Sequence, residues 1–230
     1  MSSAALLLSG LACSTDIFDV NVNLATQTYT MDFGSATGTI PTLTCATGMP
    51  SVCEVESRAA VTATTGPGNV TIDFGCDPAT QRCFAEGTAR QTVEVDVLQD
   101  PGFVTSVERH SAWVVKSVTL AYTVPTNTLT FEVPKIDVYV GPPGTTKETD
   151  PGVEFVDSTM PLPAGTTIVD PPGQLTVAAG SAARDLIVSS VQSKQTLVFV
   201  VVATPRIEAG APVPAGSLQL NVTPTLGLGF

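Results

Sequence analysis

Apolar and polar residues alternate along most of this chain. Side chains at every second position of a β-strand point to the same face, so a two-residue period predicts strands with one buried face. Alternating segments occur at residues 17–24, 28–33, 69–75, 92–97, 118–124, 129–133 and 136–140, with shorter strands expected at 166–169 and 174–178. The chain also holds 19 glycines and 18 prolines, which favour turns. We therefore expect a predominantly β chain, with turns at 99–103 and 125–128.

The C-terminal half contains two segments that depart from this alternation. Residues 181–193 place apolar side chains at helical spacing after Ser181, which predicts a short helix capped by that serine. Residues 196–204, TLVFVVVAT, form a continuous apolar run that is typical of a central strand buried on both faces. Residues 142–165 are expected to be rich in loops. Alternation returns at residues 217–230, which we expect to form a buried strand at the edge of a sheet.

The succession of short strands predicts an all-β fold. We expect an antiparallel β-sandwich with an immunoglobulin-like layout, one short helix and disulfide-bearing loops. The likeness is to an architecture only, because Trp113 follows all the cysteines and the Cys…Trp…Cys order of immunoglobulin domains is missing. A chain of 230 residues can bury a substantial core. We expect a single sandwich domain at residues 16–230, and two domains that meet near residues 100–102 are the alternative.

The charge of the chain narrows the choice of partners. The formal net charge is −11 at pH 7, and charged residues make up only 13% of the chain. The acidic residues are scattered along the sequence, which is typical of a well-solvated surface. An acidic surface repels phosphate backbones, so we expect no nucleic acid as a partner.

An apolar run, Ala4–Ala12, lies near the start of the chain and is followed directly by Cys13. Its nine residues are far fewer than the roughly 20 that a helix needs to cross a bilayer, but they suit the apolar region of a signal peptide. Ala12 and Cys13 match the last two positions of the signal of bacterial lipoproteins, whereas Gly10 and Leu11 depart from it. The N-terminus therefore resembles a lipobox.

The resemblance to bacterial lipoproteins implies an address and an anchor. It implies that residues 1–12 are a signal peptide, that Cys13 is lipidated, and that residues 13–15 form a short tether. Ser14 resembles the residue that accompanies sorting to the outer membrane. The protein is thus expected in the bacterial cell envelope, anchored to the outer membrane and facing the periplasm or the cell surface. Ordinary signal-peptidase cleavage, or a buried fold element at Leu6–Leu8, are the alternatives.

The cysteine count agrees with an exported chain. There are five cysteines, and setting Cys13 aside leaves an even set: Cys45, Cys53, Cys76 and Cys83. An even number in an exported protein predicts disulfides. Bridges Cys45–Cys53 and Cys76–Cys83 would close two small loops, but four cysteines allow three pairings and the sequence leaves all three open. A zinc site is disfavoured, because zinc ligands usually follow a C-x(2–4)-C spacing that is missing here.

Candidate catalytic and metal-binding residues are few. The single histidine, His110, lies next to Ser111, but neighbouring strand residues face opposite sides of a sheet, so we expect no catalytic pair and no enzymatic activity. No cofactor is expected. Acidic side chains are densest at residues 147–157, where a solvated loop is one interpretation and a weak calcium site the other. They lack the spacing of an EF-hand loop, but these residues offer oxygen ligands: Glu148, Asp150, Glu154 and Asp157.

Taken together, these features predict a membrane-tethered envelope lipoprotein. It would act through binding or structural contacts, with an envelope protein or a surface ligand as its partner. A secreted, calcium-dependent binding module is one alternative. The other is a small outer-membrane β-barrel, because a terminal strand that ends on Phe230 resembles the closing strand of such barrels. The aromatic content of 6% is too low for the two interfacial girdles of a barrel.

Overall fold

The computed structural model of the protein describes residues 19–34, 38–45, 52–54, 56, 70–108 and 113–229. These residues form two antiparallel sheets that pack face to face, so the predicted all-β sandwich is confirmed. Its elements are β1 (Asp19–Asn23), β2 (Gln27–Asp32), β3 (Val70–Cys76), β4 (Cys83–Val95), the 3-10 helix η1 (Val97–Gln99), α2 (Pro101–Glu108), β5 (Val114–Asn127), β6 (Ile136–Gly141), β7 (Glu154–Ser158), β8 (Ile168–Thr176), α3 (Ala182–Gln192), β9 (Leu197–Ala203), β10 (Arg206–Glu208) and β11 (Ser217–Gly229).

Each sheet contains one position that is shared by two short strands. In the first sheet the order is β1/β2–β11–β5–β8, and β1 and β2 pair with successive parts of the same edge of β11. In the second sheet the order is β3–β4–β9/β10–β6–β7, and β9 and β10 share one edge of β4. Every pair of strands is antiparallel.

The connections between the strands are those of a jelly roll. We number the strands along the chain, counting β1/β2 as one strand and β9/β10 as one strand and leaving out β3. The first sheet then has the strand order 1-8-3-6, and the second has the order 2-7-4-5. This is the double Greek key of an eight-stranded jelly roll. The immunoglobulin domain shares the two-layer architecture but has its own strand order. Alternation along a strand predicts which face is buried, and both strand orders satisfy it equally well.

The inward-facing side chains of both sheets form one large hydrophobic core. Strands on either side of residues 100–102 contribute to it, since β2 pairs with β11 and β4 pairs with β9. Its fully buried members include Tyr29, Leu120, Ile136, Leu175, Phe199 and Leu218. The core therefore draws on strands from both sides of residues 100–102, whereas the segments around Ile40 and the cysteines form small clusters of their own.

β9 is the central strand that the apolar run predicts. It lies between β4 and β6, and all seven of its residues are buried. Alternate side chains join the main core, whereas those of Val198, Val200 and Val202 form a separate apolar cluster. Both faces of β9 are therefore apolar and buried. The face that carries Val198, Val200 and Val202 points away from the main core, so other residues must cover it.

β11 is a central strand, and the expected edge position is wrong. It has β1 and β2 on one side and β5 on the other. The carbonyl of Pro224 accepts a hydrogen bond of 2.8 Å from the N–H of Leu24, at the bend between β1 and β2. Proline has no N–H to donate, and the nitrogen of Pro224 lies on the side of the same bend. No strand pairing there requires a donor from β11, so the proline is tolerated. The alternation of apolar and polar residues did not reveal this central position, because central and edge strands of an antiparallel sheet show the same alternation.

A helix follows β4 where the sequence suggests a turn at residues 99–103. Asp100 accepts a hydrogen bond of 2.9 Å from the N–H of Phe103, and Pro101 is the first residue of α2. Both are favoured positions at a helix start. Phe103 and Val107, one helical turn apart, are buried in the core. The turn prediction is wrong because Asp-Pro-Gly suits a reversal and a capped helix alike.

β5 continues through the turn that is expected at residues 125–128. Pro125 lies where the register between β5 and β11 shifts, as in a β-bulge. The strand expected at residues 129–133 is not formed, and Val133 makes only an isolated bridge. Leu129 and Val133 are nevertheless buried. The alternation there reports burial of an irregular segment, and the strand prediction is wrong.

The remaining elements of the C-terminal half lie close to their expected positions. α3 is the helix expected at residues 181–193, and Ser181 caps it by accepting a hydrogen bond from the N–H of Arg184. β8 joins the two short strands expected there into one strand with an irregularity near its middle. β7 lies within the segment expected to be loops.

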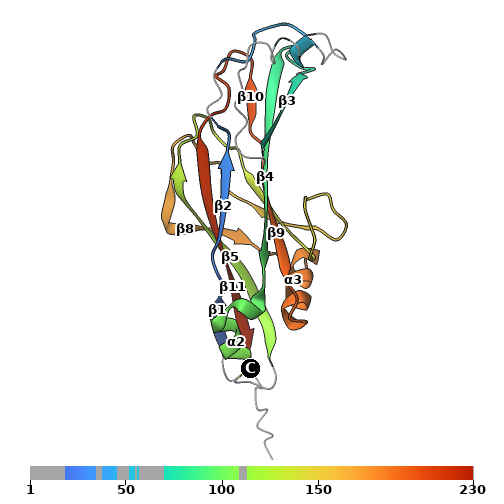
Figure 1. Ribbon diagram of the computed structural model, residues 1–230, viewed down its shortest axis with the longest axis vertical. Coiled ribbons are helices and arrows are strands. Elements are labelled where there is room, and N and C mark those ends of the chain that lie inside the picture. Colours follow the sequence, from blue (N-terminus) through green and yellow to red (C-terminus); the bar gives the residue numbers. More distant parts are fainter. Residues whose placement is uncertain are drawn as a thin grey trace, which may run out of the picture.

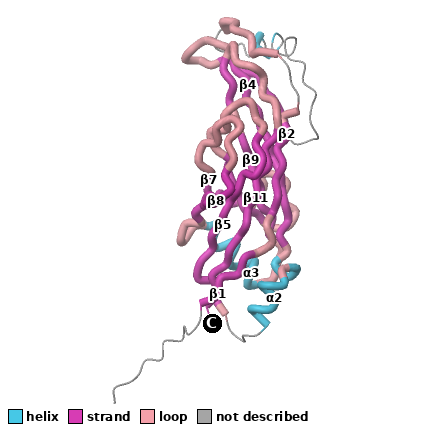
Figure 2. The backbone as a smooth tube through the Cα atoms, turned by 90° about the vertical axis from the view of Figure 1, so that its left-hand side faces the viewer, coloured by secondary structure: helices cyan, strands magenta, loops and turns pink. Residues whose placement is uncertain are grey.

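The sandwich is elongated, with distinct ends (Figure 1, Figure 2). β1, α2 and the last residues of β11 lie at one end, and β3, β10 and the first half of β4 lie at the other. β4 and β11 contain 13 residues each and β5 contains 14. At about 3.3 Å per residue these strands are roughly 43–46 Å long. β4, which begins beside β3 and β10 and leads into η1 and α2, therefore connects the two ends directly.

Candidate functional site

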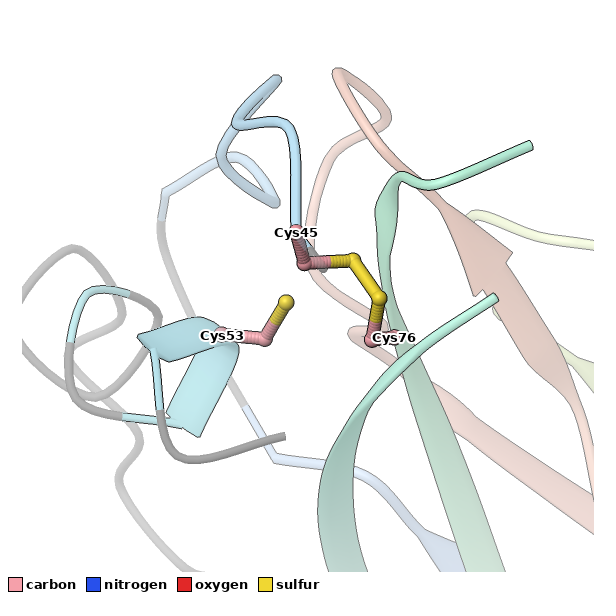
Figure 3. Close-up of side chains that lie close together, drawn as sticks. All are labelled: Cys45, Cys53 and Cys76. Atoms are coloured by element: carbon pink, nitrogen blue, oxygen red, sulfur yellow. A yellow bond between two sulfur atoms is a disulfide. The ribbon is translucent and has the colours of Figure 1, made fainter. Parts of the chain in front are cut away.

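The end of the sandwich opposite β1 carries the cysteines. We call the four cysteines, the β3–β4 hairpin and β10 the disulfide tip. Cys76 and Cys83 face each other across the hairpin ladder. Cys76 is bonded to Cys45, as Figure 3 shows, and Cys83 is bonded to Cys53. The predicted disulfides are thus present. The two small local loops are not formed, because each bridge joins residues 31 or 30 positions apart.

Three of the tip sulfurs lie close enough together to raise the question of a metal. The Sγ atoms of Cys45, Cys53 and Cys76 lie within 4.8 Å of one another, the one such group of three or more His, Cys, Asp or Glu side chains within the described ranges. All three sulfurs belong to disulfides, whereas a metal binds thiolates. The cluster therefore serves as a double covalent cross-link of the tip.

Arg206 on β10 joins the polar groups of the tip. Its guanidinium lies 4.1 Å from the centroid of the Phe84 ring, donates to Glu208 at 2.8 Å and pairs with Asp77. Asp77 also accepts hydrogen bonds from backbone N–H groups of the hairpin turn. The N–H of Thr80 and then the Arg206 guanidinium hold the pKa of Asp77 below its ordinary value. The surface of the tip is therefore organised by charge-assisted bonds as well as by disulfides.

The four acidic residues considered for calcium do not converge. Glu148 pairs with Arg90, and Asp150 accepts hydrogen bonds from residues 146 and 147 within its own turn. Asp157 accepts a bond of 2.6 Å from a backbone N–H of β8, and Glu154 begins β7. No three of their oxygens lie within 4.8 Å of one another, in the part of the chain that the structure describes. Three of the four act as internal hydrogen-bond acceptors.

Residues 142–153, which connect β6 to β7, pass over the outer face of the second sheet. We call this segment the strap. Gly141 is the ladder neighbour of Val198 on β9, and its outward side faces away from the core. A Cβ atom on Gly141 would collide with the side chain of Thr145. Thr145 therefore lies on the outer face of the sheet, beside the first valine of the apolar cluster.

The far part of the strap is held by an ion pair. Nε and Nη2 of Arg90 donate to Oε2 and Oε1 of Glu148 at 2.5 and 2.6 Å, and this bond lowers the pKa of Glu148. Arg90 adjoins Val202 from the β4 side. Tyr139 flanks β9 from the β6 side, and its pKa is raised by burial and then by the charges of Asp137 and Glu148. Glu148 thus lies above β9, and the strap crosses that strand.

No protein-family model, curated protein or solved structure matches this chain. A jelly roll carries many functions, so the fold alone does not indicate one. Cys13 and His110, which the sequence singles out for lipidation and as the single histidine, lie outside the described residues. Within the described residues, no helix combines the length and the apolar character needed to span a bilayer.

The sequence did not point to two features of the outer face. Arg90 lies 58 positions from Glu148, in an alternating strand where an outward arginine is ordinary, so nothing local indicates the pair. The rings of Tyr139 and Phe155 stack edge to face with centroids 5.4 Å apart, and Phe155 is 50% exposed. The one sequence feature that could have indicated this pair is Phe155, an aromatic residue in a segment that was expected to be rich in loops.

Proposed function

We propose that this protein is a membrane-tethered lipoprotein of the bacterial cell envelope that acts by binding or structural contacts rather than by catalysis. The observation that carries the proposal is the cysteine inventory. The other four cysteines are bonded to one another, which leaves Cys13 over, directly after the apolar run Ala4–Ala12. A lipidated cysteine that carries two or three acyl chains is sufficient for stable anchoring.

The shape of the molecule supports a defined orientation. Asp19, the first described residue, pairs with Gly229 at the end opposite the disulfide tip. Cys13 precedes Asp19 by six residues, which span at most about 20 Å when fully extended. A lipid on Cys13 would therefore hold the β1 end close to the membrane and direct the disulfide tip away from it.

The disulfide tip has properties that suit a contact surface. Its backbone is cross-linked twice, so little conformational entropy would be lost when a partner binds. Apolar side chains are exposed beside two of the cysteines, with Leu43 38% and Val52 42% exposed. We infer that an envelope protein or a surface ligand contacts this end.

The intact mass of the mature protein, isolated from cells that export it, tests the anchor. We expect the chain to begin at Cys13 and to carry diacylglycerol there. Cys13→Ser should abolish the lipid, whereas Ser14→Ala, the matched control, should retain it. A wild-type mass without lipid on Cys13, or one that still includes Met1, would overturn the proposal.

A photo-cross-linking residue placed at either end tests the contact surface. Leu43 lies near the disulfide tip, and Val114, which is 51% exposed, pairs with Gly229 at the other end. We expect specific cross-links to an envelope component from position 43 and none from position 114. Cross-links from position 114 alone would contradict the proposed orientation and leave the lipid anchor to the mass measurement.

A further inference from the structure

The outer face of β9 carries an apolar strip where a solvated face of an antiparallel sheet is ordinarily polar. Val198, Val200 and Val202, which we call the valine strip, are exposed by only 1%, 0% and 6%. The ladder neighbours that flank this strip are Glu94, Thr92 and Arg90 on β4 and Gly141, Tyr139 and Asp137 on β6. Gly141 and Thr92 are too short to cover the valines beside them. Two strap residues lie on this face, Thr145 against Gly141 and Glu148 against Arg90.

The strap is organised mainly by bonds within itself. The Asp150 carboxylate accepts bonds from the N–H and hydroxyl of Thr146 at 2.8 and 2.9 Å and from the N–H of Lys147 at 3.1 Å. The hydroxyl of Thr145 donates to the carbonyl of Pro142 at 2.8 Å. Among the described residues, the hydrogen bonds that join the strap to another element are the two that Arg90 donates to Glu148. A preformed segment is thus held down by a single polar attachment.

Glycines lie near both ends of the strap. Gly144 has φ +87° and Gly152 has φ +77°, a backbone region that glycine enters without a steric penalty. Gly141 ends β6 directly before the strap. Hinges are typically a few residues at the ends of elements that absorb a change in backbone angles. Gly144 and Gly152 are therefore the positions at which the ends of the strap could absorb a change in backbone angles, since φ is fixed at the neighbouring Pro143 and Pro151.

We propose that the strap is a lid that turns on its glycine-containing ends and is latched closed by the Arg90–Glu148 pair, so that opening uncovers the valine strip and Tyr139. Burial of the strip favours the closed state. The latch is partly solvated, with the Arg90 and Glu148 side chains 35% and 20% exposed, and such pairs contribute modestly. A single substitution in the latch should therefore shift the equilibrium between the closed and open states measurably. This device does not depend on the lipid anchor.

Trypsin offers a direct measure of opening, because Lys147 is the one lysine or arginine in residues 142–153. Arg90→Gln removes the latch without altering the sequence around that cleavage site. Arg206→Gln is the matched control, since it removes an ion-pairing arginine at the disulfide tip. In the full-length protein we expect cleavage after Lys147 to be about two- to fivefold faster in Arg90→Gln than in wild type, and unchanged in Arg206→Gln.

Two further measurements distinguish a lid from a general loss of stability. In Arg90→Gln, hydrogen exchange should accelerate in the strap while β9 keeps its protection, and fluorescence of the apolar dye ANS should rise. Equal cleavage in Arg90→Gln and wild type would overturn the proposal. So would an equal acceleration in both variants, a loss of protection that extends to β9, or faster cleavage without additional ANS binding.

Discussion

The crossed disulfides should contribute strongly and interdependently to stability. A bridge restricts the unfolded chain, and in the loop-entropy treatment the effect grows with the logarithm of the loop length. The Cys53–Cys83 bridge spans 30 residues. When Cys45–Cys76 is closed, however, the shortest path between the same two residues runs through that bridge and contains about 15 residue steps. Loss of one bridge should therefore cost about 3 kcal/mol, and loss of both about 7 kcal/mol.

Urea unfolding of three variants measures these values. Replacing Cys53 and Cys83 by alanine, or Cys45 and Cys76 by alanine, should give equal losses, because either pair closes the same short path when the other is present. The variant without all four should lose slightly more than the sum. The reasoning would be refuted if removal of one bridge lowered the free energy of unfolding by less than about 1 kcal/mol. It would also be refuted if the variant that lacks both bridges were as stable as a variant that lacks one.

The connectivity itself can be read from peptides of the non-reduced protein. Cleavage after Met49 by cyanogen bromide and after Arg58 and Arg82 by trypsin places the four cysteines on separate peptides. We expect the peptide that ends at Met49 to be linked to the one that ends at Arg82. A peptide pair that joins Cys45 to Cys53 would show local loops instead and would remove the basis of the energy estimate.

Three further changes test packing, capping and electrostatics. Gly173→Ala should destabilise the protein by about 1–3 kcal/mol in urea unfolding, because a Cβ there would collide with the Tyr122 ring. Asp100→Ala should cost about 1 kcal/mol in the same assay, since its carboxylate caps α2. Glu148→Gln should flatten the acid end of the stability profile. The hydrogen bond from Arg90 lowers the pKa of Glu148 below its ordinary 4.5 in the folded protein. The contribution of Glu148 to the free energy of unfolding is therefore complete above pH 4.5 and disappears as the pH falls through the lower folded-state pKa. Urea unfolding at a series of pH values measures this change.

The Gly173→Ala prediction has a matched control. Gln174→Ala, at an exposed neighbouring position, should change stability far less than Gly173→Ala. Equal losses at the two positions would contradict the close approach of the Tyr122 ring. A stability profile of Glu148→Gln that runs parallel to the wild-type profile through the acid range would show that Arg90 does not lower that pKa.

Strand positions were predictable from alternation where one face of a strand is buried, and from a continuous apolar run where both faces are buried. The alternation in β11 and the continuous apolar run in β9 both correspond to strands at those positions. Prediction was weaker where one sequence suits two structures. The Asp-Pro-Gly at residues 100–102 fits a turn by its local chemistry, and burial of Phe103 and Val107 in the core favours the helix.

The candidate site was predictable only in its composition. The even cysteine set indicates disulfides, but the pairing depends on which segments meet beside the β3–β4 hairpin. Glu148 attracted attention as part of an acidic segment, yet its role comes from Arg90, which β4 places beside β9. Charges this far apart in the chain become neighbours only through the order of strands in the sheet.

Alternation, apolar runs and the cysteine count are local properties, so the amino-acid sequence alone was enough to indicate a β-sandwich with disulfides and with its β9 segment buried on both faces. The neighbours of each strand are a different matter. The jelly-roll order, the central position of β11, the crossed bridges and the strap over the valine strip all depend on contacts between distant segments. The local pattern is compatible with several such arrangements, and the packing of the complete core selects one of them.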